Sequence, residues 1–335
     1  MSSLPAFYSG ADNALACIFS VSGTSLTDQE RALFQRSNPF GFILFARNCE
    51  TPNQVQKLVA ALKECVGREC PILIDQEGGR VQRLKPPHWS ASRPMKFYGS
   101  LFSKDPGHAR IGLQNDADRL SVDLLNVGVN VNCAPVLDVL TSRTHDVIGD
   151  RAFSNDPAIV ADLGLVASRR YLDNGIIPVV KHLPGHGRAT SDSHKELPVV
   201  DASLEDLKAA DFKPFQAIAE SDIGHAVWGM TAHVLFEAID PDRPVTLSAR
   251  GIEVLREDIG FDGVLMGDDL DMKALDPYGS IAERCVMTLD AGCDLALYCW
   301  ADLQIMQDIA EICPKLRPDT LKRLQKAGEV WEKVA

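Results

Sequence analysis

Short apolar runs alternate with amphipathic segments from one end of the chain to the other. Eight of these runs are predicted to be strands: Ala14–Val21, Gly41–Arg47, Pro71–Gln76, Val129–Val139, Ile176–His182, Ala226–Val234, Gly263–Asp268 and Cys293–Trp300. They are almost continuously hydrophobic, as strands buried on both faces of a sheet are. We therefore expect a parallel sheet whose outer face is covered by helices.

Between these runs, apolar residues recur at helical spacing. The predicted helices are Pro52–Cys65, Asn115–Gly128, Pro157–Asp173, Ala202–Ala219, Ser248–Asp258, Ser280–Ala291 and Pro318–Val334. Ser203 and Ser280 are each followed three residues later by an acid, which is the pattern of a capping box.

Eight strands that alternate with helices favour an α/β protein with a (β/α)8 barrel, the TIM barrel. A doubly wound open sheet is the competing architecture, but the chain has neither a GxGxxG nor a GxxxxGKS/T loop to support it. No linker divides the chain, so we expect one catalytic barrel over residues 1–335, with a C-terminal amphipathic helix. Two connections, Leu84–Asp105 and Gly185–Asp201, are long, and long loops in compact barrels are usually functional.

Composition and charge exclude several classes of protein. The net charge of −12 argues against a general binder of nucleic acid phosphates. The nine cysteines are scattered, odd in number and without CxxC spacing, as expected in a reducing compartment. The N-terminus lacks a signal sequence, and the apolar run Leu15–Val21 is too short to span a bilayer. We therefore expect a cytoplasmic protein that binds neither nucleic acid nor a membrane. We also expect a monomer, which these features do not decide.

Polar residues gather where the predicted strands end, which is where barrel enzymes place their chemistry. They follow five of the eight strands: Asp75 to Arg80, Asp138 with Asp150 and Arg151, Lys181 to His186, His233, and Asp268 with Asp269. Charged groups at five ends on one face are difficult to explain as packing and indicate an active site. Asp268 and Asp269 are adjacent and should point to opposite sides, so only one of them is expected to face the site.

His182 and His186 are four residues apart, a spacing that would suggest a metal pair on a helix. Pro184, Gly185 and Gly187 preclude a regular helix there, so no metal site is predicted. We find no ligand set for a metal or an organic cofactor.

Several of these motifs together resemble glycoside hydrolase family 3. The segment Lys181-His-Leu-Pro-Gly-His-Gly-Arg-Ala-Thr-Ser-Asp-Ser-His194, followed by Leu197-Pro198, looks like the family's signature. Asp75-Gln-Glu-Gly-Gly-Arg-Val-Gln-Arg-Leu84, Ile148-Gly-Asp-Arg-Ala-Phe153, Met230-Thr-Ala-His233 and Gly267-Asp-Asp-Leu270 fall in the family's order. Within the family, the chain is most similar to the single-domain bacterial β-N-acetylglucosaminidases of the NagZ type. Leu183 and Gln76 depart from the usual aromatic residue and histidine, and could alter the shape of a subsite.

The resemblance implies retaining hydrolysis of a terminal N-acetylglucosamine β-linked to (1,6-anhydro-)N-acetylmuramic acid or its peptides, in peptidoglycan recycling. By position, Asp268 matches the nucleophile, His194 the general acid/base and Asp192 its partner. The residues that match sugar-binding positions are Asp75, Arg83, Arg151, Lys181 and His182. Lys181 and Arg151 are expected to keep Asp268 ionised by their opposite charge.

Three alternatives stay open. A phosphorylase of the same family would use phosphate in place of water, and a histidine donor would not repel that anion. Lys181 at a strand end could instead be the Schiff-base lysine of a lyase. A non-catalytic sugar-binding barrel would tolerate the loss of His194 without losing binding.

Overall fold

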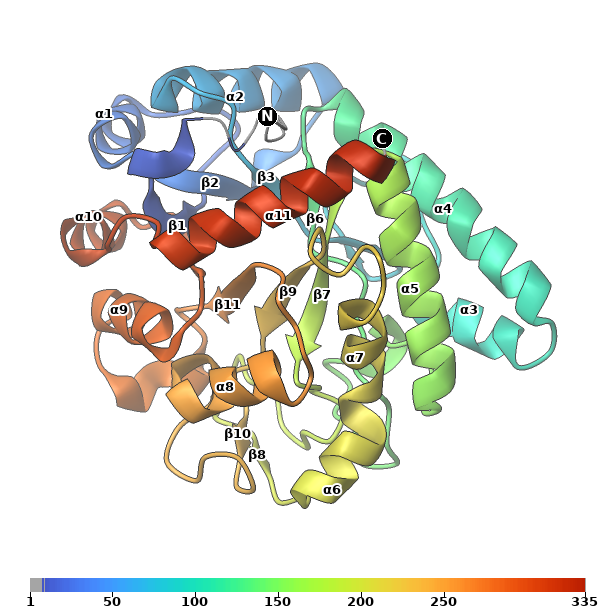
Figure 1. Cartoon of the computed structure of the whole chain (residues 1–335). Helices are drawn as coiled ribbons and strands as arrows, with labels where there is room; N and C mark the ends of the chain where they lie inside the picture. Colours follow the sequence, from blue (N-terminus) through green and yellow to red (C-terminus); the bar gives the residue numbers. More distant parts are fainter. Residues whose placement is uncertain (1–7, 9, 335) are drawn as a thin grey trace.

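A closed barrel of eight parallel strands forms the centre of the computed structural model, which describes residue 8 and residues 10–334 (Figure 1). The barrel strands are β1 (Leu15–Phe19), β2 (Pro39–Leu44), β3 (Ile72–Ile74), β6 (Val131–Asn132), β7 (Ile177–Leu183), β9 (Trp228–Thr231), β11 (Leu265–Asp269) and β12 (Leu295–Leu297). Each predicted run overlaps one of these strands, so the predicted (β/α)8 fold is confirmed.

Neighbouring barrel strands follow one another along the chain, and β12 closes the ring against β1. At the closure Cys17 lies opposite Ala296, and Ile18 lies opposite Leu297. All carboxyl ends of the strands therefore meet at the same end of the barrel, as a parallel βα repeat requires.

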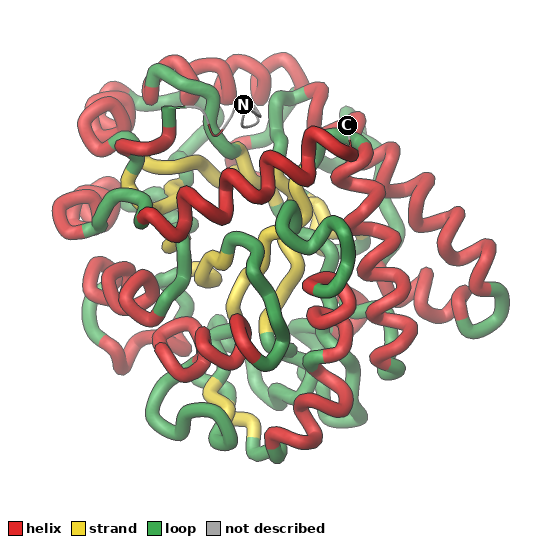
Figure 2. Tube along the Cα trace, viewed as in Figure 1, coloured by secondary structure: helices red, strands yellow, loops and turns green. Residues whose placement is uncertain are grey.

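Helices surround the strands (Figure 2). The longer ones are α1 (Asp28–Ser37), α2 (Pro52–Val66), α3 (Met95–Phe102), α4 (Pro106–Asn126), α5 (Pro157–Asp173), α7 (Lys213–Ala219), α8 (Ala249–Glu257), α9 (Ile281–Ala291), α10 (Leu303–Ile312) and α11 (Pro318–Val334). The predicted helix Ala202–Ala219 is interrupted, because α6 (Leu204–Asp206) passes through a π-helical turn, η5 (Leu207–Asp211), before α7.

Three helices, α1, α3 and α10, were not predicted. The helix α1 is mostly polar, and a capping box between Thr27 and Glu30 defines its start. The helix α3 lies inside the long Leu84–Asp105 connection, so that loop is partly helical.

The helix α11 lies across the amino-terminal end of the barrel (Figure 1). Asp294, just before β12, accepts hydrogen bonds from Thr320 and Arg323 of this helix at 2.7 and 2.9 Å. The helix therefore covers the end of the barrel opposite the carboxyl ends of the strands, and that other end is left to the loops.

Two small strand pairs extend the carboxyl end of the barrel. The strand β4 (Gln76–Gly78) pairs with β5 (Val81–Gln82), and β8 (Val199–Val200) pairs with β10 (Leu235–Phe236). None of the described helices is long and apolar enough to span a bilayer.

Candidate active site

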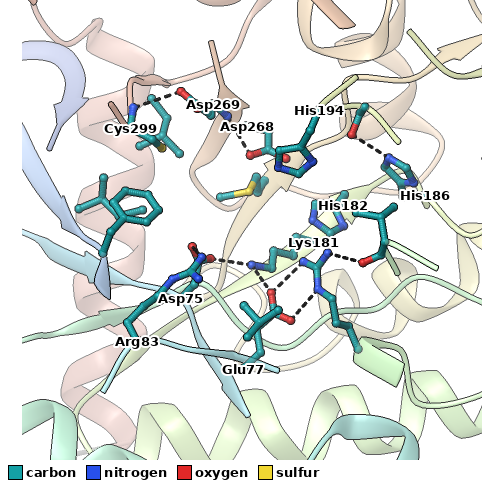
Figure 3. Close-up of a pocket in the computed structure, with 18 of the residues that line it drawn as sticks. Asp75, Glu77, Arg83, Lys181, His182, His186, His194, Asp268, Asp269 and Cys299 are labelled. Atoms are coloured by element: carbon teal, nitrogen blue, oxygen red, sulfur yellow. Dashed lines mark hydrogen bonds and ion pairs between the residues drawn. The ribbon is translucent and has the colours of Figure 1, made fainter. Parts of the chain in front are cut away.

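A cavity of about 370 Å³ opens at the carboxyl ends of the barrel strands (Figure 3). Seven of the eight predicted site residues line it: Asp75, Arg83, Arg151, Lys181, His182, His194 and Asp268. The eighth, Asp192, stands behind His194 and bonds to it. The structure therefore brings the predicted residues together from four separate βα units.

Asp75, just after β3, holds two of the predicted cations. Its Oδ1 accepts a hydrogen bond from Lys181 Nζ at 2.8 Å, and its Oδ2 accepts one from Arg83 at 3.0 Å. Burial of this carboxyl would raise its pKa, but the charges of Lys181 and Arg83 lower it far below the ordinary value. Asp75 is thus ionised and fixed in place, with both cations turned toward the cavity.

Glu77 is a carboxylate of the site to which the sequence patterns assigned no role. Arg151 bonds to both of its oxygens at 2.8 Å, and Lys181 Nζ lies 2.6 Å from Oε1. Burial opposes ionisation of Glu77, but the charges of Arg151 and Lys181 lower its pKa, so it holds no proton to donate. Its place two residues after Asp75, on the same side of the extended chain, was the available sequence signal.

Lys181 is correspondingly committed to charge pairing. Burial would lower its pKa, but the carboxylates Asp75 and Glu77 raise it above the ordinary value for lysine. The expectation that Lys181 and Arg151 keep Asp268 ionised is wrong, because their described ion pairs are with Asp75 and Glu77.

Asp268, near the end of β11, is kept ionised by other groups. Burial would raise its pKa, but the nearby His233, His182 and His194, and the backbone N–H of Asp269, lower it. That N–H donates to Asp268 Oδ1 at 2.8 Å. Figure 3 shows the carboxylate beside the His194 ring.

Asp269 also lines the cavity, but its carboxyl accepts the backbone N–H groups of Cys299 and Asp271, in line with the expectation that the two adjacent side chains point to opposite sides. Its side chain turns toward β12, where Oδ1 accepts a hydrogen bond from the Cys299 N–H at 3.1 Å. Burial and the neighbouring charge of Asp268 raise the pKa of Asp269 to about 7. The two adjacent carboxyls therefore differ in charge below neutrality.

His194 lies on the loop after β7, and its side chain is 61% exposed. Asp192 Oδ1 accepts hydrogen bonds from the backbone N–H of His194 at 3.0 Å and from ring Nδ1 at 2.9 Å. Between them, Ser193 is buried, with Oγ 3.2 Å from His186 Nε2 and its carbonyl bonded to the N–H of Ala274. The loop is thus anchored through Ser193 while the ring of His194 faces solvent and the cavity.

His182 is fixed by Asp138, a buried residue that follows β6. Asp138 Oδ2 accepts a hydrogen bond from His182 Nδ1 at 2.8 Å, and Oδ1 accepts the backbone N–H groups of His182 and His186 at 3.1 and 2.6 Å. His182 and His186 have rings 5.7 Å apart that meet edge to face. Within the described residues, no cluster of three His, Cys, Asp or Glu side chains could hold a metal ion.

Two aromatic residues, Phe45 and Trp300, also line the cavity. Phe45 follows β2, and the guanidinium of Arg47 lies 4.8 Å from the centre of its ring, with that of Arg83 at 5.4 Å. Trp300, after β12, lines the cavity and is 62% exposed. The cavity therefore combines a polar, charged floor with an aromatic rim, and a few fixed polar groups of this kind orient a small ligand.

The two departures from the family pattern lie outside the cavity lining. Gln76 is buried, and its Oε1 accepts hydrogen bonds from the N–H groups of Arg83 and Leu84 at 2.8 and 3.0 Å, which ties the β4–β5 turn. Leu183 is fully buried beside Gly229 of β9. The structure therefore gives both residues packing roles, not contacts in the cavity.

Comparisons with known proteins agree with this arrangement. The family model "Glycosyl hydrolase family 3 N terminal domain" matches residues 15–327. A curated β-hexosaminidase of Nitrosomonas eutropha is 36% identical over 282 residues, covering 83% of this chain and 79% of that protein. NagZ from Neisseria gonorrhoeae, solved in complex with N-trifluoroacetyl-D-glucosamine, has a TM-score of 0.84 at 29% identity, covering 96% of this chain and 94% of that one.

A family 3 β-N-acetylglucosaminidase from Paenibacillus sp. has a TM-score of 0.83 at 31% identity. The match covers 95% of this chain but 61% of that longer chain. The family model spans nearly the whole barrel, and the matches to the Nitrosomonas and Neisseria proteins cover most of both chains. The chain therefore belongs to glycoside hydrolase family 3, as a member of the NagZ type.

Proposed function

We propose that this β-hexosaminidase removes a terminal, non-reducing N-acetylglucosamine by retaining hydrolysis, through a covalent intermediate on Asp268. Its family and its curated relatives support the hydrolase activity. The observation that carries the mechanism is the position of His194, which Asp192 holds through Nδ1, beside the ionised Asp268 in one cavity (Figure 3).

Asp268 is the better nucleophile of the two adjacent carboxyls. Its lowered pKa keeps it ionised, whereas Asp269, with its pKa near 7, is protonated through most of the acidic range. In the first step a carboxylate oxygen of Asp268 attacks the anomeric carbon, and the glycosidic C–O bond breaks. The product is a glycosyl ester on Asp268.

His194 supplies the proton that the leaving oxygen needs. Because Nδ1–H is bonded to Asp192, Nε2 is the ring atom that can face the leaving group. In the second step His194 takes a proton from water, the water oxygen attacks the anomeric carbon, and Asp268 is released as a carboxylate. Net retention follows from two successive displacements.

The remaining predicted residues are suited to holding the terminal sugar. Asp75 and Lys181 form a fixed acceptor and donor on the cavity floor, and Arg83 and Arg151 flank them. A sugar with several hydroxyls needs such preorganised partners to be oriented. We assign His182 to the same group.

On the leaving-group side we propose (1,6-anhydro-)N-acetylmuramic acid or its peptides. The resemblance to enzymes of cell-wall recycling supports this aglycone, and the aromatic rim at Phe45 and Trp300 offers an apolar face for it. A monomer acting in the cytoplasm fits the reduced, scattered cysteines.

Activity on an aryl β-N-acetylglucosaminide, compared with the matching β-glucoside, tests this function. We expect hydrolysis of the first alone, with the β-anomer of N-acetylglucosamine as the first product seen by proton NMR. Inactivity on both substrates, or release of the α-anomer, would refute the proposal.

A substrate-assisted route would use the 2-acetamido group as the nucleophile in place of Asp268. A thiazoline analogue of that cyclic intermediate should therefore bind this enzyme poorly. Potent inhibition by the analogue would favour the assisted route.

Two of the three alternatives lose support from the geometry. Lys181 lies between two carboxylates that keep it protonated, which removes the lone pair a Schiff base requires. A sugar-binding protein would have no use for the His194–Asp192 pair. A phosphorylase remains distinguishable by adding phosphate, because it would then yield N-acetylglucosamine 1-phosphate, whereas we expect the free sugar.

A further inference from the structure

Asp138 is a buried carboxylate beneath the cavity that the proposed reaction does not use directly. It is fully buried and does not line the cavity. Its two oxygens have separate tasks. Oδ1 accepts the backbone N–H groups of His182 and His186, and among the residues that the structure describes Oδ2 accepts only the ring Nδ1–H of His182.

An ionised carboxylate can only accept hydrogen bonds, so the ring atom that meets Oδ2 must carry the hydrogen. Burial would raise the pKa of Asp138, but the charge and hydrogen bond of His182, with those of His186, lower it to about 2. Two further charged groups act on the ionisation of Asp138. The positive charge of Arg151 favours the ionised form, and the negative charge of Asp211 opposes it. Asp138 therefore stays ionised across the range in which a glycosidase operates, and the hydrogen of His182 stays on Nδ1.

The other ring nitrogen of His182, Nε2, is available to a ligand in the cavity. Within the described residues, Nε2 of His182 makes no hydrogen bond, while the ring lines the cavity. We propose that Asp138 is a positioning residue that fixes the hydrogen of His182 on Nδ1 and thereby presents Nε2 to one hydroxyl of the terminal sugar. The sugar contact in this inference rests on the proposed function, whereas the assignment of the hydrogen does not.

Because the two oxygens of Asp138 bond to different groups, Asp138→Asn should change the bond to the His182 ring and keep the bonds to the backbone. The amide oxygen can replace Oδ1 and keep both backbone N–H bonds. The amide nitrogen then replaces Oδ2 and is a donor, so it must meet an unprotonated Nδ1. The hydrogen of a neutral His182 ring then moves to Nε2, so the atom that faces the sugar changes from a hydrogen-bond acceptor to a donor.

Asp294 offers a matched control. It is also buried, and its side chain accepts hydrogen bonds from Arg256, Arg323, Thr320 and the N–H of Leu265. It lies at the amino-terminal end of the barrel, away from the cavity. Asp294→Asn therefore removes a buried charge and costs stability without touching His182.

The first test is nitrogen NMR of the enzyme labelled with ¹⁵N-histidine, with the His182 signals assigned by their loss in His182→Gln. We expect a hydrogen on Nδ1 of His182 in the wild-type enzyme, and in Asp138→Asn a hydrogen on Nε2 with Nδ1 unprotonated. Finding Nδ1 unprotonated in the wild type would overturn the proposal. This result needs the His182→Gln protein for the assignment, but it needs neither a folded Asp138 variant nor any hexosaminidase activity.

The second test uses aryl N-acetylglucosaminides that each lack one hydroxyl. We expect Asp138→Asn to lower kcat/KM at least about tenfold, the scale typical of residues that orient a functional side chain. The loss should be equal for good and poor leaving groups, unlike that of a variant of the acid/base. On the one deoxy substrate that lacks the hydroxyl contacting His182, the wild type and the variant should become equal.

These outcomes separate a positioning role from a structural one. A loss that is the same on every deoxy substrate, or an equal loss in Asp294→Asn, would overturn the proposal. Inactivity of the wild-type enzyme on all N-acetylglucosaminides would instead refute the proposed function, while the NMR result would still decide where the hydrogen of His182 lies.

Discussion

Asp192 holds His194 with a single oxygen, which accepts both the backbone N–H of His194 and its ring Nδ1. Two bonds to one atom fix the position of the loop and the rotation of the ring together. Asp192 is largely buried while the His194 side chain is mostly exposed, so the exposed ring rests on a fixed support. The same bonds lower the pKa of Asp192 although burial opposes this, which keeps it ionised as an imidazolium forms on His194.

Replacement of His194 by Ala should remove general acid–base help, which is typically worth about 10²–10⁴-fold. Substrates with poor leaving groups should lose most in the first step, because they need the proton. Activated aryl glycosides should form the intermediate and hydrolyse it slowly, and azide should restore turnover by accepting the sugar without base help. Steady-state and burst kinetics over a series of leaving groups measure this.

Equal losses on all leaving groups, with no rescue by azide, would mean that His194 only positions the loop. The acid would then have to be another group. Glu77 is a poor candidate, because its charge pairs with Arg151 and Lys181 keep it ionised.

The raised pKa of Asp269 should make the stability of the protein depend on pH. Its pKa lies near 7 in the folded protein and near 4 when exposed, so the folded state keeps a proton that the unfolded state has already lost. The contribution of Asp269 to the free energy of unfolding therefore falls as the pH rises from about 4 to 7, and is lowest above 7. Asp269→Asn removes this penalty.

Thermal unfolding of Asp269→Asn and the wild type between pH 4.5 and 8 tests this dependence. The advantage of the variant should grow with pH, by about 3 kcal/mol in free energy of unfolding between pH 4.5 and 8. Asp308→Asn, which changes an exposed carboxyl on α10, should show no such trend. A constant difference between Asp269→Asn and the wild type across the range would contradict the raised pKa.

Glu77→Gln should destabilise the protein and weaken binding together. Removing this charge leaves Arg151 without its described ion-pair partner and leaves Lys181 paired with Asp75 alone. Breaking a buried pair typically costs about 3–5 kcal/mol. Urea denaturation should show the loss, and KM should rise on every substrate. A variant with unchanged stability would show that the pairs are compensated elsewhere.

The barrel could be predicted from the sequence because its signal is local. Eight continuous apolar runs separated by amphipathic segments have few other arrangements, and each run overlaps a barrel strand. The helix α1 lacks a wide apolar stripe, so the capping box of Thr27 and Glu30 is the main mark that it leaves in the sequence. The helix α3 was hidden in a connection that was predicted only as a long loop.

The sequence was enough to predict which residues line the candidate site, but not which of them form ion pairs with one another. Asp75 and Lys181 stand at or near strand ends, and Arg151 lies on the loop after β6, so position alone indicated them. Their partners depend on which side chains meet across the barrel, and Lys181 and Asp75 are 106 residues apart in the chain. This is why Glu77 was missed and why the cations were wrongly paired with Asp268.

Because Trp300 is exposed at the cavity rim, its replacement should weaken binding of the aglycone and leave binding of the terminal sugar unchanged. Trp300 is 62% exposed at the cavity rim, so its indole can stack on a sugar in the leaving-group position but does not reach the buried floor. Trp300→Ala should raise KM several-fold for a disaccharide substrate, by about 1 kcal/mol of lost stacking, and leave KM for a small aryl glycoside unchanged. Ile111→Ala, at an exposed apolar residue of α4, is the control. Equal changes on both substrates would place Trp300 outside the leaving-group site.

The central claim is that Asp268 forms the glycosyl–enzyme bond, and trapping that bond tests it most directly. A fluorinated N-acetylglucosaminyl fluoride slows the second step, so the intermediate should accumulate, and mass spectrometry of the digested protein should find the sugar on Asp268. Asp268→Asn should neither be labelled nor turn over substrate, although it should fold normally. A sugar found on Asp269, or inactivation of the wild type without any covalent adduct, would contradict this mechanism.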